Sequence, residues 1–513
     1  MIRHVKCAIL IFVAIIATEL GSASARTQVV APQVVALPTV TGPVPQTVSS
    51  YAFNSAAHYA KPSDLSKFGY VEDEYFQDGK ARVYDWPRIG KLESLGVGLY
   101  KTRILVRRPS DAAHFNGAVI IEPLNPSHMA DLDLMWIFSH QYLMHLGYAW
   151  IGVTVKPVSV AALKRFNAER YVSLSLANPL PSTESCPDLE LGPSDVSSEV
   201  GLAQDIISQL GALVRSDSSN NPMSGYKVSR VYLTGYSQTA GYVRGYANSI
   251  APLAKTSGDR NIFDGYLEAG HGPFNVPLNN CAKLFQHGDP RLKVGKIGVP
   301  FMDVAGEGDT LVTYFMRQPD GNQAPNLFRR YEVAGSTHSG SLTQGSTPTD
   351  KDFARAGAFV TSFAGCRPDT YGLSEFPLNY VLDAMWQNLD DWVVSKKPPP
   401  AGTRLVLEKA SSDLGTGVAT KKDKYGNTLG GVRTTAVDVP TATWYSSRGG
   451  PDRCMRVGYD VPFDKATLEK LYPTHEIYVQ KVAAAAERLR AQRWLTPFDA
   501  QEIIAEADNA AIP

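Results

Sequence analysis

A serine between an apolar run and a helix is the first feature of this sequence that could do chemistry. The run 231–233 leads into a Gly-x-Ser motif that ends at Ser237, and residues 238–247 predict a helix. A strand–Gly-x-Ser–helix turn is typical of a nucleophilic serine, because the sharp turn is strained and requires small neighbours. Thr239 stands where the usual G-x-S-x-G pattern has its second glycine. The motif is weak by itself, so Ser237 must have partners.

A base for Ser237 can be found by elimination. Enzymes built around this turn carry serine, acid and histidine in that order, and four histidines follow the serine: His271, His287, His338 and His475. His338 comes after the strand-like run 328–333 and a Gly-Ser-Thr loop, as a base at the edge of a sheet would. We interpret His271 as a core residue that could line the pocket, and His475 as a surface residue.

An acid is expected after the preceding strand. The run 299–305 predicts that strand, and a Gly-x-Gly-Asp loop with Asp309 follows it. Asp309 would hold the imidazole of His338, which would take the proton of Ser237 as the serine attacks an acyl carbon. Glu307, on the same loop, is the alternative acid. A loop histidine is more often a surface residue, and an aspartate beside glycines a turn former, but three such features in order favour a triad.

An oxyanion hole requires two donors. The backbone N–H of Gln238, next to the nucleophile, would supply one. The second would come from the loop after the third strand, where Pro123 and Pro126 have no N–H. Asn125 is therefore our prediction for the second donor, by its backbone or its side chain. The alternative is that Asn125 only shapes the loop.

The remaining pattern alternates strands with helices and predicts an α/β fold. Continuous apolar runs at 117–122 and 148–155 indicate central parallel strands, and 134–146 and 199–214 indicate helices between strands. Residues 77–79 predict a hairpin turn between strands 69–76 and 80–84. The alternation of apolar and charged residues over 101–109 indicates an edge or half-exposed strand. We expect a mostly parallel central sheet of about eight strands flanked by helices.

The chain can be divided into five kinds of segment. Residues 1–25 resemble a secretory signal peptide, with Arg3 and Lys6 before an apolar run too short to span a bilayer. This predicts a secreted or periplasmic protein. The other predicted segments are an extended part (26–68), an α/β core (69–400), insertions in that core at about 156–197, 273–296 and 340–377, and an extension packed on the core (401–513).

Four cysteines remain after the predicted signal peptide, namely Cys186, Cys281, Cys366 and Cys454. Their even number favours disulfides in an exported protein, but the sequence leaves all three pairings open. No pair has C-x-x-C spacing, and we expect neither a metal nor another cofactor. Asp131 and Asp133 are interpreted as a pair at a helix start.

Charge excludes some classes of partner. The chain has 50 basic and 50 acidic residues, evenly mixed, and a formal net charge of zero. Such a balance does not favour binding to nucleic acid or to an anionic membrane. Beyond the first residues no stretch has the length of a transmembrane helix. A small-molecule ester is the expected partner, and the oligomeric state is left open.

Several motifs together resemble one family. The chain is similar to the exported bacterial "α/β hydrolase domain" proteins over nearly its whole mature length, in the runs 69–76, 100–109, 115–117, 235–239, 426–433, 471–473 and 494–500. In that family Ser-Gln-Thr is a common ending of the serine motif, as in residues 237–239. The resemblance implies an α/β-hydrolase fold and a serine-hydrolase mechanism, without implying a substrate.

The sequence therefore predicts an exported serine hydrolase that cleaves carboxylic esters through Ser237, His338 and Asp309. An acyltransferase or peptidase could use the same triad. A non-catalytic binding protein with a hydrolase fold is the alternative from another class, although such proteins usually lack one of the three residues.

Overall fold

A computed structural model describes residues 28–188, 190–192, 194–345, 347–359, 363–409 and 416–512. The predicted signal peptide, residues 1–25, lies outside the described residues. Within them no helix is both long and apolar enough to cross a membrane.

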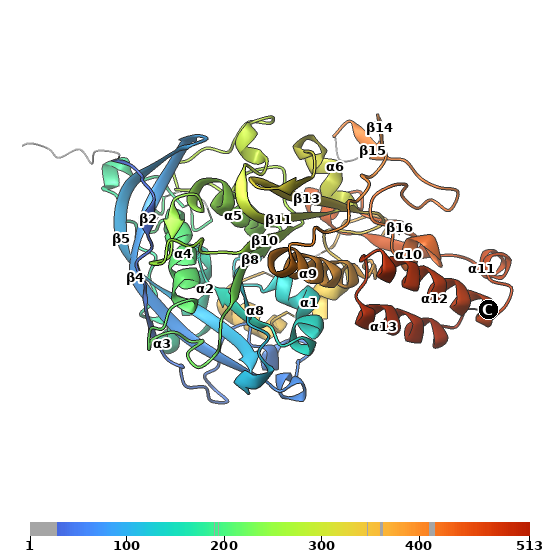
Figure 1. The fold of residues 1–513 in the computed structure, drawn as a ribbon, viewed down its shortest axis with the longest axis horizontal. Helices are drawn as coiled ribbons and strands as arrows, with labels where there is room; N and C mark the ends of the chain where they lie inside the picture. Colours follow the sequence, from blue (N-terminus) through green and yellow to red (C-terminus); the bar gives the residue numbers. More distant parts are fainter. Residues whose placement is uncertain are drawn as a thin grey trace, which may run out of the picture.

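One large twisted sheet organises the molecule (Figure 1). Eleven strands of the described residues belong to it, and three of these, β1, β3 and β12, have only two or three residues. The eight longer strands agree with the predicted number. Across the sheet the order is β12 (Gly321–Gln323), β13 (Asn326–Val333), β11 (Ile297–Gly306), β10 (Gly265–Ala269), β8 (Arg230–Tyr236), β6 (Ala118–Pro123), β7 (Ala149–Val153), β5 (Lys91–Pro109), β4 (Tyr70–Arg88) and β3 (Thr39–Thr41), with β1 (Gln28–Val29) beside β5.

The central part of the sheet is parallel, as the apolar runs predicted. Six strands that are neighbours in the order β7, β6, β8, β10, β11 and β13 pair in parallel. The strands β1, β3, β4, β5 and β12 pair antiparallel with their neighbours. The carboxyl ends of the parallel strands therefore meet at one edge, where loop residues from β6, β8, β11 and β13 can converge.

Helices cover both faces of this sheet. Gly265 of β10 contacts Leu389 of α9. The next residue, Tyr266, faces Tyr246, which comes directly after α5. Because successive strand residues point to opposite faces, these helices lie on opposite sides. The helices are α1 (Leu134–His145), α2 (Pro157–Phe166), α3 (Ala168–Tyr171), α4 (Ala203–Val214), α5 (Gln238–Gly245), α6 (Glu307–Thr313), α7 (Leu342–Gly345), α8 (Asp350–Ala356), α9 (Leu378–Ser395), α10 (Thr435–Asp438), α11 (Lys465–Leu471), α12 (His475–Ala491) and α13 (Pro497–Asp508).

The predicted hairpin turn at residues 77–79 is wrong. Strand β4 runs without interruption to Arg88, and the chain turns only before Lys91. Gly79 serves close packing instead of a turn, because a Cβ there would lie 2.8 Å from Oε1 of Gln209. The true turn contains Gly90, whose φ of +74° suits a residue without a side chain.

The prediction of an edge strand over 101–109 is also wrong. This part of β5 lies between β4 and β7, and Arg103 and Arg107 are fully buried. Arg103 pairs with Asp131 at 2.7 Å, and Arg107 pairs with Asp133 and with Glu72. The two aspartates therefore bind arginines of the sheet, and Asp133 makes no side-chain cap to α1 although it stands at its start. We interpreted buried charges as exposed ones, because alternation of apolar and charged residues does not show which face of a strand is exposed to solvent.

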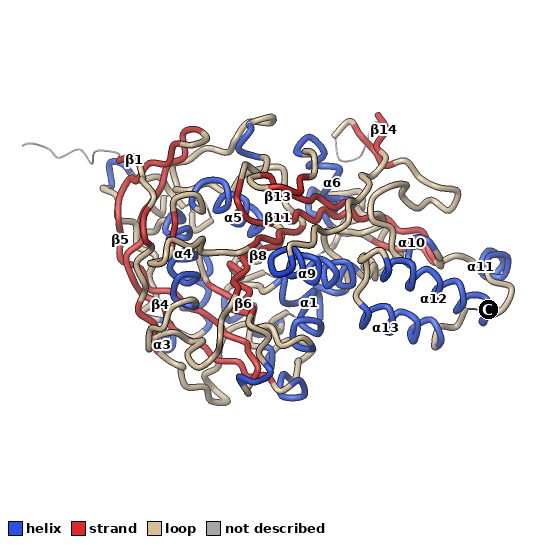
Figure 2. Tube along the Cα trace, in the orientation of Figure 1, coloured by secondary structure: helices blue, strands red, loops and turns tan. Residues whose placement is uncertain are grey.

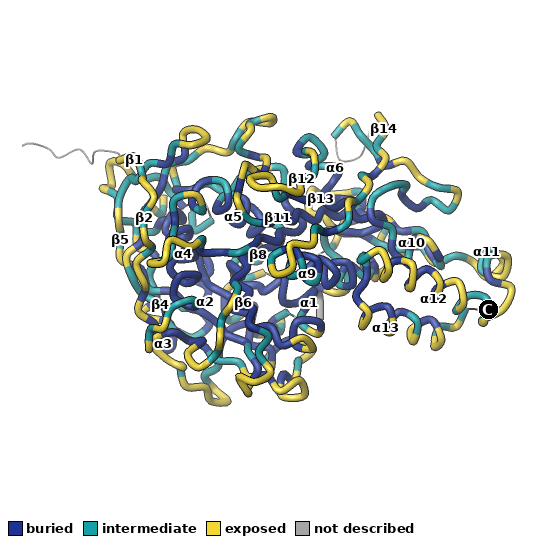
Figure 3. The backbone as a smooth tube through the Cα atoms, in the orientation of Figure 1, coloured by how far each residue is buried: buried dark blue, intermediate teal, exposed yellow. Residues whose placement is uncertain are grey.

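The buried residues form a continuous core along the sheet, with exposed segments at the periphery (Figure 3). Residues after 400 form short strands and helices at one end of the molecule (Figure 2). There β14 (Leu407–Lys409) pairs with β15 (Val418–Thr420), and β16 (Ala442–Tyr445) pairs with β17 (Tyr459–Pro462). Helices α12 and α13 pack around their own apolar cluster, and β2 (Gln33–Val34) pairs with β9 (Ala254–Lys255) elsewhere.

Two disulfides tie the predicted insertions to other parts of the chain. Cys186 is bonded to Cys281, which joins the insertion at 156–197 to that at 273–296. Cys366 is bonded to Cys454, which joins the insertion at 340–377 to the C-terminal extension. The pairing that the sequence left open is thus fixed by the fold.

Candidate active site

Ser237 occupies a strained turn between β8 and α5. Its φ is 58° and its ψ is −119°, a conformation that a residue with a side chain rarely adopts. A Cβ at Gly235 would lie 2.5 Å from the carbonyl oxygen of Thr239, so only glycine allows this turn. The Thr239 hydroxyl accepts the Tyr236 N–H at 3.1 Å and donates to its carbonyl oxygen at 3.0 Å. Thr239 therefore closes the turn where a second glycine is usual.

His338 and Asp309 lie beside this serine in a hydrogen-bonded row. Nε2 of His338 is 2.9 Å from Oγ of Ser237, and Nδ1 is 2.6 Å from Oδ1 of Asp309. Asp309 is in the first turn of α6, where its Oδ2 accepts the Gly306 N–H at 3.0 Å. The Tyr236 hydroxyl donates to the carbonyl oxygen of His338 at 2.7 Å and fixes the loop after β13. This geometry can move a proton from serine to imidazole.

Glu307 has other partners. It is buried, and its Oε2 accepts the N–H of Gly335 at 2.8 Å. Its Oε1 accepts from the Thr420 hydroxyl at 2.8 Å and pairs with Nζ of Lys422 at 2.7 Å. The carboxylate is thus held by the start of a loop and by the C-terminal extension. Of the two acids considered, only Asp309 contacts His338.

The two predicted oxyanion donors are placed differently. Gln238 begins α5, and the first N–H groups of a helix have no acceptor within it. The Asn125 N–H instead donates to the carbonyl oxygen of Leu132 at 2.7 Å, and its Nδ2 donates to that of Tyr236 at 2.8 Å. Asn125 is fully buried and joins the loop after β6 to the serine turn. Its contacts correct our assignment: Asn125 positions the loop, because its donors are used within the protein.

The family of the protein follows from its sequence as a whole. The family described as "Alpha/beta hydrolase domain" matches residues 40–505. The chain belongs to this family. The match includes the serine turn, the acid and the histidine as well as most of the C-terminal extension, and it confirms the predicted fold and the resemblance.

Solved structures similar to this α/β hydrolase are distant. Esterase Est22 is 11% identical with a TM-score of 0.30, over 58% of this chain and 83% of that one. A serine hydrolase homologue from Coxiella burnetii is 10% identical with a TM-score of 0.26, over 50% and 91% of the two chains. Dienelactone hydrolase from Anabaena variabilis is 12% identical with a TM-score of 0.27, over 55% and 96%. No curated protein matches the sequence significantly.

A buried group of charges lies on strands β10, β11 and β13 and on helix α5 of this hydrolase. Glu268 of β10, Asp303 of β11 and Arg330 of β13 are direct neighbours across the sheet. Arg244 of α5 pairs with Glu268 and, at 3.1 Å, with Asp303, which also pairs with Arg330 at 2.7 Å. We call Arg244, Glu268, Asp303 and Arg330 the ionic floor. Burial opposes ionisation of Asp303, but Arg330 and Arg244 outweigh it and lower its pKa.

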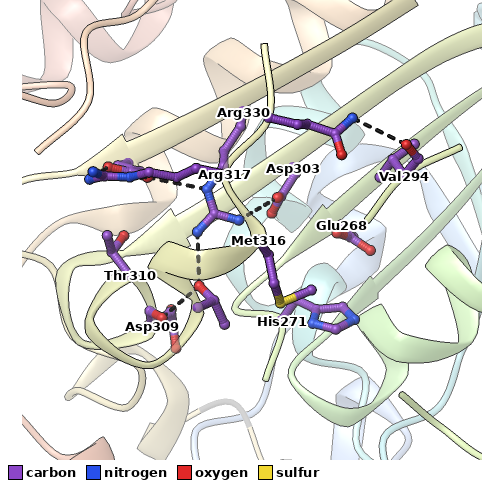
Figure 4. Close-up of polar contacts among 12 residues, drawn as sticks. Glu268, His271, Val294, Asp303, Asp309, Thr310, Met316, Arg317 and Arg330 are labelled. Carbon is purple, nitrogen blue, oxygen red and sulfur yellow. Dashed lines mark hydrogen bonds and ion pairs between the residues drawn. The ribbon is translucent and has the colours of Figure 1, made fainter. Parts of the chain in front are cut away.

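The ionic floor contacts the helix that carries Asp309 (Figure 4). Nη2 of Arg330 donates to the Thr313 hydroxyl at 2.8 Å, and this hydroxyl donates to the backbone carbonyl oxygen of Asp309 at 2.7 Å. Arg244 belongs to the helix that starts after the serine, and Arg330 to the strand that leads to His338. The floor therefore touches the elements next to all three of Ser237, Asp309 and His338.

His271 lies between this floor and the cavity beside the serine. It is buried, lines the cavity, and its Nδ1 contacts the carbonyl oxygen of Gly272. Burial, and then the charge of Arg244, lower the pKa of His271 well below its usual value. His271 is thus an uncharged residue that lines the cavity, as the sequence allowed.

His475 lies elsewhere, where its ring nitrogens contact the carbonyl oxygens of Asp508 and Ile512 near the end of the chain.

The cavity beside Ser237 and His338 also has residues that sequence reasoning missed. Lys156, Glu190 and Gln238 form a polar group in which Oε1 of Glu190 accepts from both other side chains at 2.9 Å. Met455 and Arg456 of the C-terminal extension line the same cavity. Gln238 belongs to the serine motif, but no motif marks Lys156, Glu190, Met455 or Arg456, because these come from an insertion and from the C-terminal extension. Among the described residues, no group of three or more His, Cys, Asp or Glu is arranged to hold a metal.

Proposed function

We propose that this α/β hydrolase is an exported serine hydrolase that cleaves carboxylic esters through Ser237, His338 and Asp309. The observation that carries the proposal is the hydrogen-bonded row of these three residues at a strained strand–helix turn. The two disulfides support export, because such bonds persist mainly in oxidising compartments.

In the first half of the proposed reaction, Oγ of Ser237 attacks the ester carbonyl carbon while Nε2 of His338 takes its proton. The carbonyl oxygen becomes an oxyanion beside the Gln238 N–H. The bond to the alcohol then breaks, and His338 returns the proton to the leaving oxygen, which yields the alcohol and an acyl-enzyme. Asp309 holds the imidazole and stabilises its protonated form.

In the second half, a water molecule attacks the acyl carbon, and His338 takes one of its protons. The bond to Ser237 breaks, the serine oxygen regains a proton from His338, and the carboxylic acid leaves. In the net reaction one water molecule cleaves the ester into an acid and an alcohol, without oxidation or reduction. All protons in these steps move among Ser237, His338, water and the leaving alcohol.

Labelling of the mature protein with a fluorophosphonate tests the proposal. We expect one adduct per chain, mapped to Ser237 by mass spectrometry, and none in Ser237→Ala. His338→Ala should label at least 10³-fold more slowly, in the range typical of triad loss. Ser110→Ala, which changes an exposed serine just after β5, serves as the control and should label normally. Absence of an adduct in folded protein contradicts the proposal.

A further inference from the structure

The cavity next to Ser237 is large for an enzyme of small esters. Its volume is about 1150 Å³, and Ser237, Gln238, Asp309 and His338 line it. Ligand pockets for drug-sized molecules usually measure about 300–1,000 Å³. A short acyl group such as acetyl would leave most of this space to water.

Large apolar side chains surround the cavity where it meets solvent. Phe274, Leu284 and Phe359 all line it, and their exposed fractions are 58%, 49% and 51%. We call these three residues the apolar mouth. Single exposed hydrophobic residues are common on protein surfaces, but several that line one cavity indicate a binding function. Phe274 and Leu284 belong to the insertion at 273–296, and Phe359 to that at 340–377.

The apolar mouth is fixed to the catalytic elements. Gly241 of α5 has no side chain, and a Cβ there would lie 2.6 Å from Cγ2 of Val276. The insertion that carries Phe274 can therefore pack directly on the helix after Ser237. On the other side, the Phe359 N–H donates to the carbonyl oxygen of His128 at 3.3 Å, and the two rings lie 5.5 Å apart. His128 belongs to the loop after β6.

The walls between mouth and serine are also largely apolar. The cavity lining includes proline, valine and methionine side chains from several loops, among them Pro126, Met129, Val276, Pro277, Val312 and Met455. Methionine adapts to irregular apolar ligands because its side chain is flexible. In the polar group of Lys156, Glu190 and Gln238, Oε1 of Glu190 accepts from both other side chains, whereas its Oε2 has no hydrogen-bond partner among the described residues.

We propose that the substrate is an ester with a large apolar group, an alkyl chain of medium length or an aromatic ring, which extends from Ser237 to the apolar mouth. The proposal rests on the proposed function and names the substrate class of the same site. The apolar group could belong to the acid or to the alcohol, because both leave the same scissile bond beside Ser237.

The test compares esters that differ only in apolar size. One arm uses p-nitrophenyl esters from acetate to decanoate, and the other uses acetate esters of ethanol to decanol followed by acid release, all below their critical micelle concentrations. We expect kcat/KM to rise in one arm by roughly two- to fourfold per added methylene, in line with burial of a methylene. The rise should end when the chain reaches the mouth.

Variants of the mouth connect this selectivity to named residues. Phe274→Ala and Phe359→Ala should reduce the preference for octanoate over acetate, or for octanol over ethanol, by about five- to twentyfold, because each removes apolar contact area. Hydrolysis of the short ester should change little. Leu99→Ala is the matched control, since Leu99 is 70% exposed on β5 and outside the cavity, and it should keep the preference.

Phosphonate probes separate failure of this proposal from failure of the proposed function. We expect a p-nitrophenyl phosphonate with an octyl chain to label Ser237 at least tenfold faster than one with an ethyl chain. Equal probe rates, together with a kcat/KM that is highest for p-nitrophenyl acetate in the first arm and for ethyl acetate in the second, overturn the apolar-group proposal and leave the nucleophile intact. Absence of labelling by both probes in folded protein overturns the proposed function and this proposal together. Activity only above the micellar concentration also overturns it and indicates binding to aggregated lipid.

Discussion

The ionic floor contacts the elements that carry Ser237, Asp309 and His338, and the apolar mouth lines the cavity beside Ser237, but the two are built in different ways. The floor consists of charged side chains on neighbouring strands and on α5, all buried. The mouth consists of apolar side chains on insertions, all about half exposed. The positions of floor residues are set by strand register, whereas those of mouth residues depend on loops and on the two disulfides.

This difference indicates that the residues that support the reaction and the residues that select the substrate lie in different parts of the molecule. A buried, paired charge tolerates little movement, because an unpaired charge in the interior is very costly. The floor can therefore hold the triad elements rigidly, as its contacts with α5, α6 and β13 indicate. Loops on the surface tolerate substitution, so the mouth can vary without disturbing the triad. We expect changes near the floor to act on kcat or stability, and changes at the mouth to act on KM.

The largest effect is expected at the acid that joins the floor to the triad. Asp309→Asn should lower kcat on a p-nitrophenyl ester by about 10³- to 10⁴-fold, because the amide no longer holds and stabilises the imidazole as a carboxylate does. Glu307→Gln is the matched control and should keep kcat within about fivefold, since Glu307 pairs with Lys422. Loss of activity in Glu307→Gln, with Asp309→Asn active, would reverse the assignment of the acid.

Asp303→Asn should have the next largest effect, now on stability. It removes the carboxylate between Arg244 and Arg330 and leaves their charges underpaired, so the free energy of unfolding should fall by about 3–5 kcal/mol in urea denaturation. The charge-neutral variant Arg244→Met with Glu268→Leu should lose less, because it removes a pair of opposite charges. A cost below about 1 kcal/mol for Asp303→Asn would show that the floor is not a rigid support.

The sequence could indicate that Ser237, Asp309 and His338 lie together, because each follows a local pattern in a known order. Ser237, Asp309 and His338 each follow an apolar run, and strands alternating with helices bring the ends of those runs to one edge. The choice between Asp309 and Glu307 was not predictable. It depends on Thr420 and Lys422, which are more than a hundred residues further along the chain.

The floor and mouth were missed for related physical reasons. Arg330 and Asp303 are charged residues inside strands, and nothing local shows that their partners are each other. Arg103 was placed on a half-exposed strand for the same reason, although it is fully buried against Asp131. The mouth residues lie in insertions without periodicity, where neither helix nor strand patterns constrain the chain. Disulfide pairing likewise follows from tertiary distance, which cysteine spacing does not give.

Loss of the disulfide that joins the insertion at 156–197 to the mouth insertion at 273–296 should have an intermediate effect. Cys186→Ser with Cys281→Ser opens a link between residues 95 apart, so the free energy of unfolding should fall by about 2–4 kcal/mol. We also expect KM for a long-chain ester to rise several-fold, with kcat nearly unchanged, because the triad elements are untouched. Cys366→Ser with Cys454→Ser provides a comparison at a separation of 88 residues. A drop in kcat with constant KM would contradict the separation of floor and mouth.

The smallest effect should be a pH dependence at the junction of the same two insertions. Glu199 is buried, and its Oε1 accepts the N–H groups of Gly201 and Asn280, both at 2.9 Å. Burial raises the pKa of Glu199 to about 7. Because this folded-state pKa lies above the ordinary value, the contribution of Glu199 to stability is complete below about pH 4.5 and is lost as the pH rises through 7.

The variant Glu199→Gln keeps both acceptor contacts but cannot ionise. From pH 4.5 to 7.5, the free energy of unfolding of the unaltered protein should therefore fall by about 1–3 kcal/mol relative to this variant. Asp195→Asn, in the insertion at 156–197 just before Glu199, should show no such fall, because hydrogen bonds from Ser197 lower the pKa of Asp195 instead. Urea denaturation at several pH values measures both differences. A constant difference between the protein and Glu199→Gln would mean that Glu199 is ionised throughout. The contact between these two insertions would then tolerate a buried charge, as the floor does.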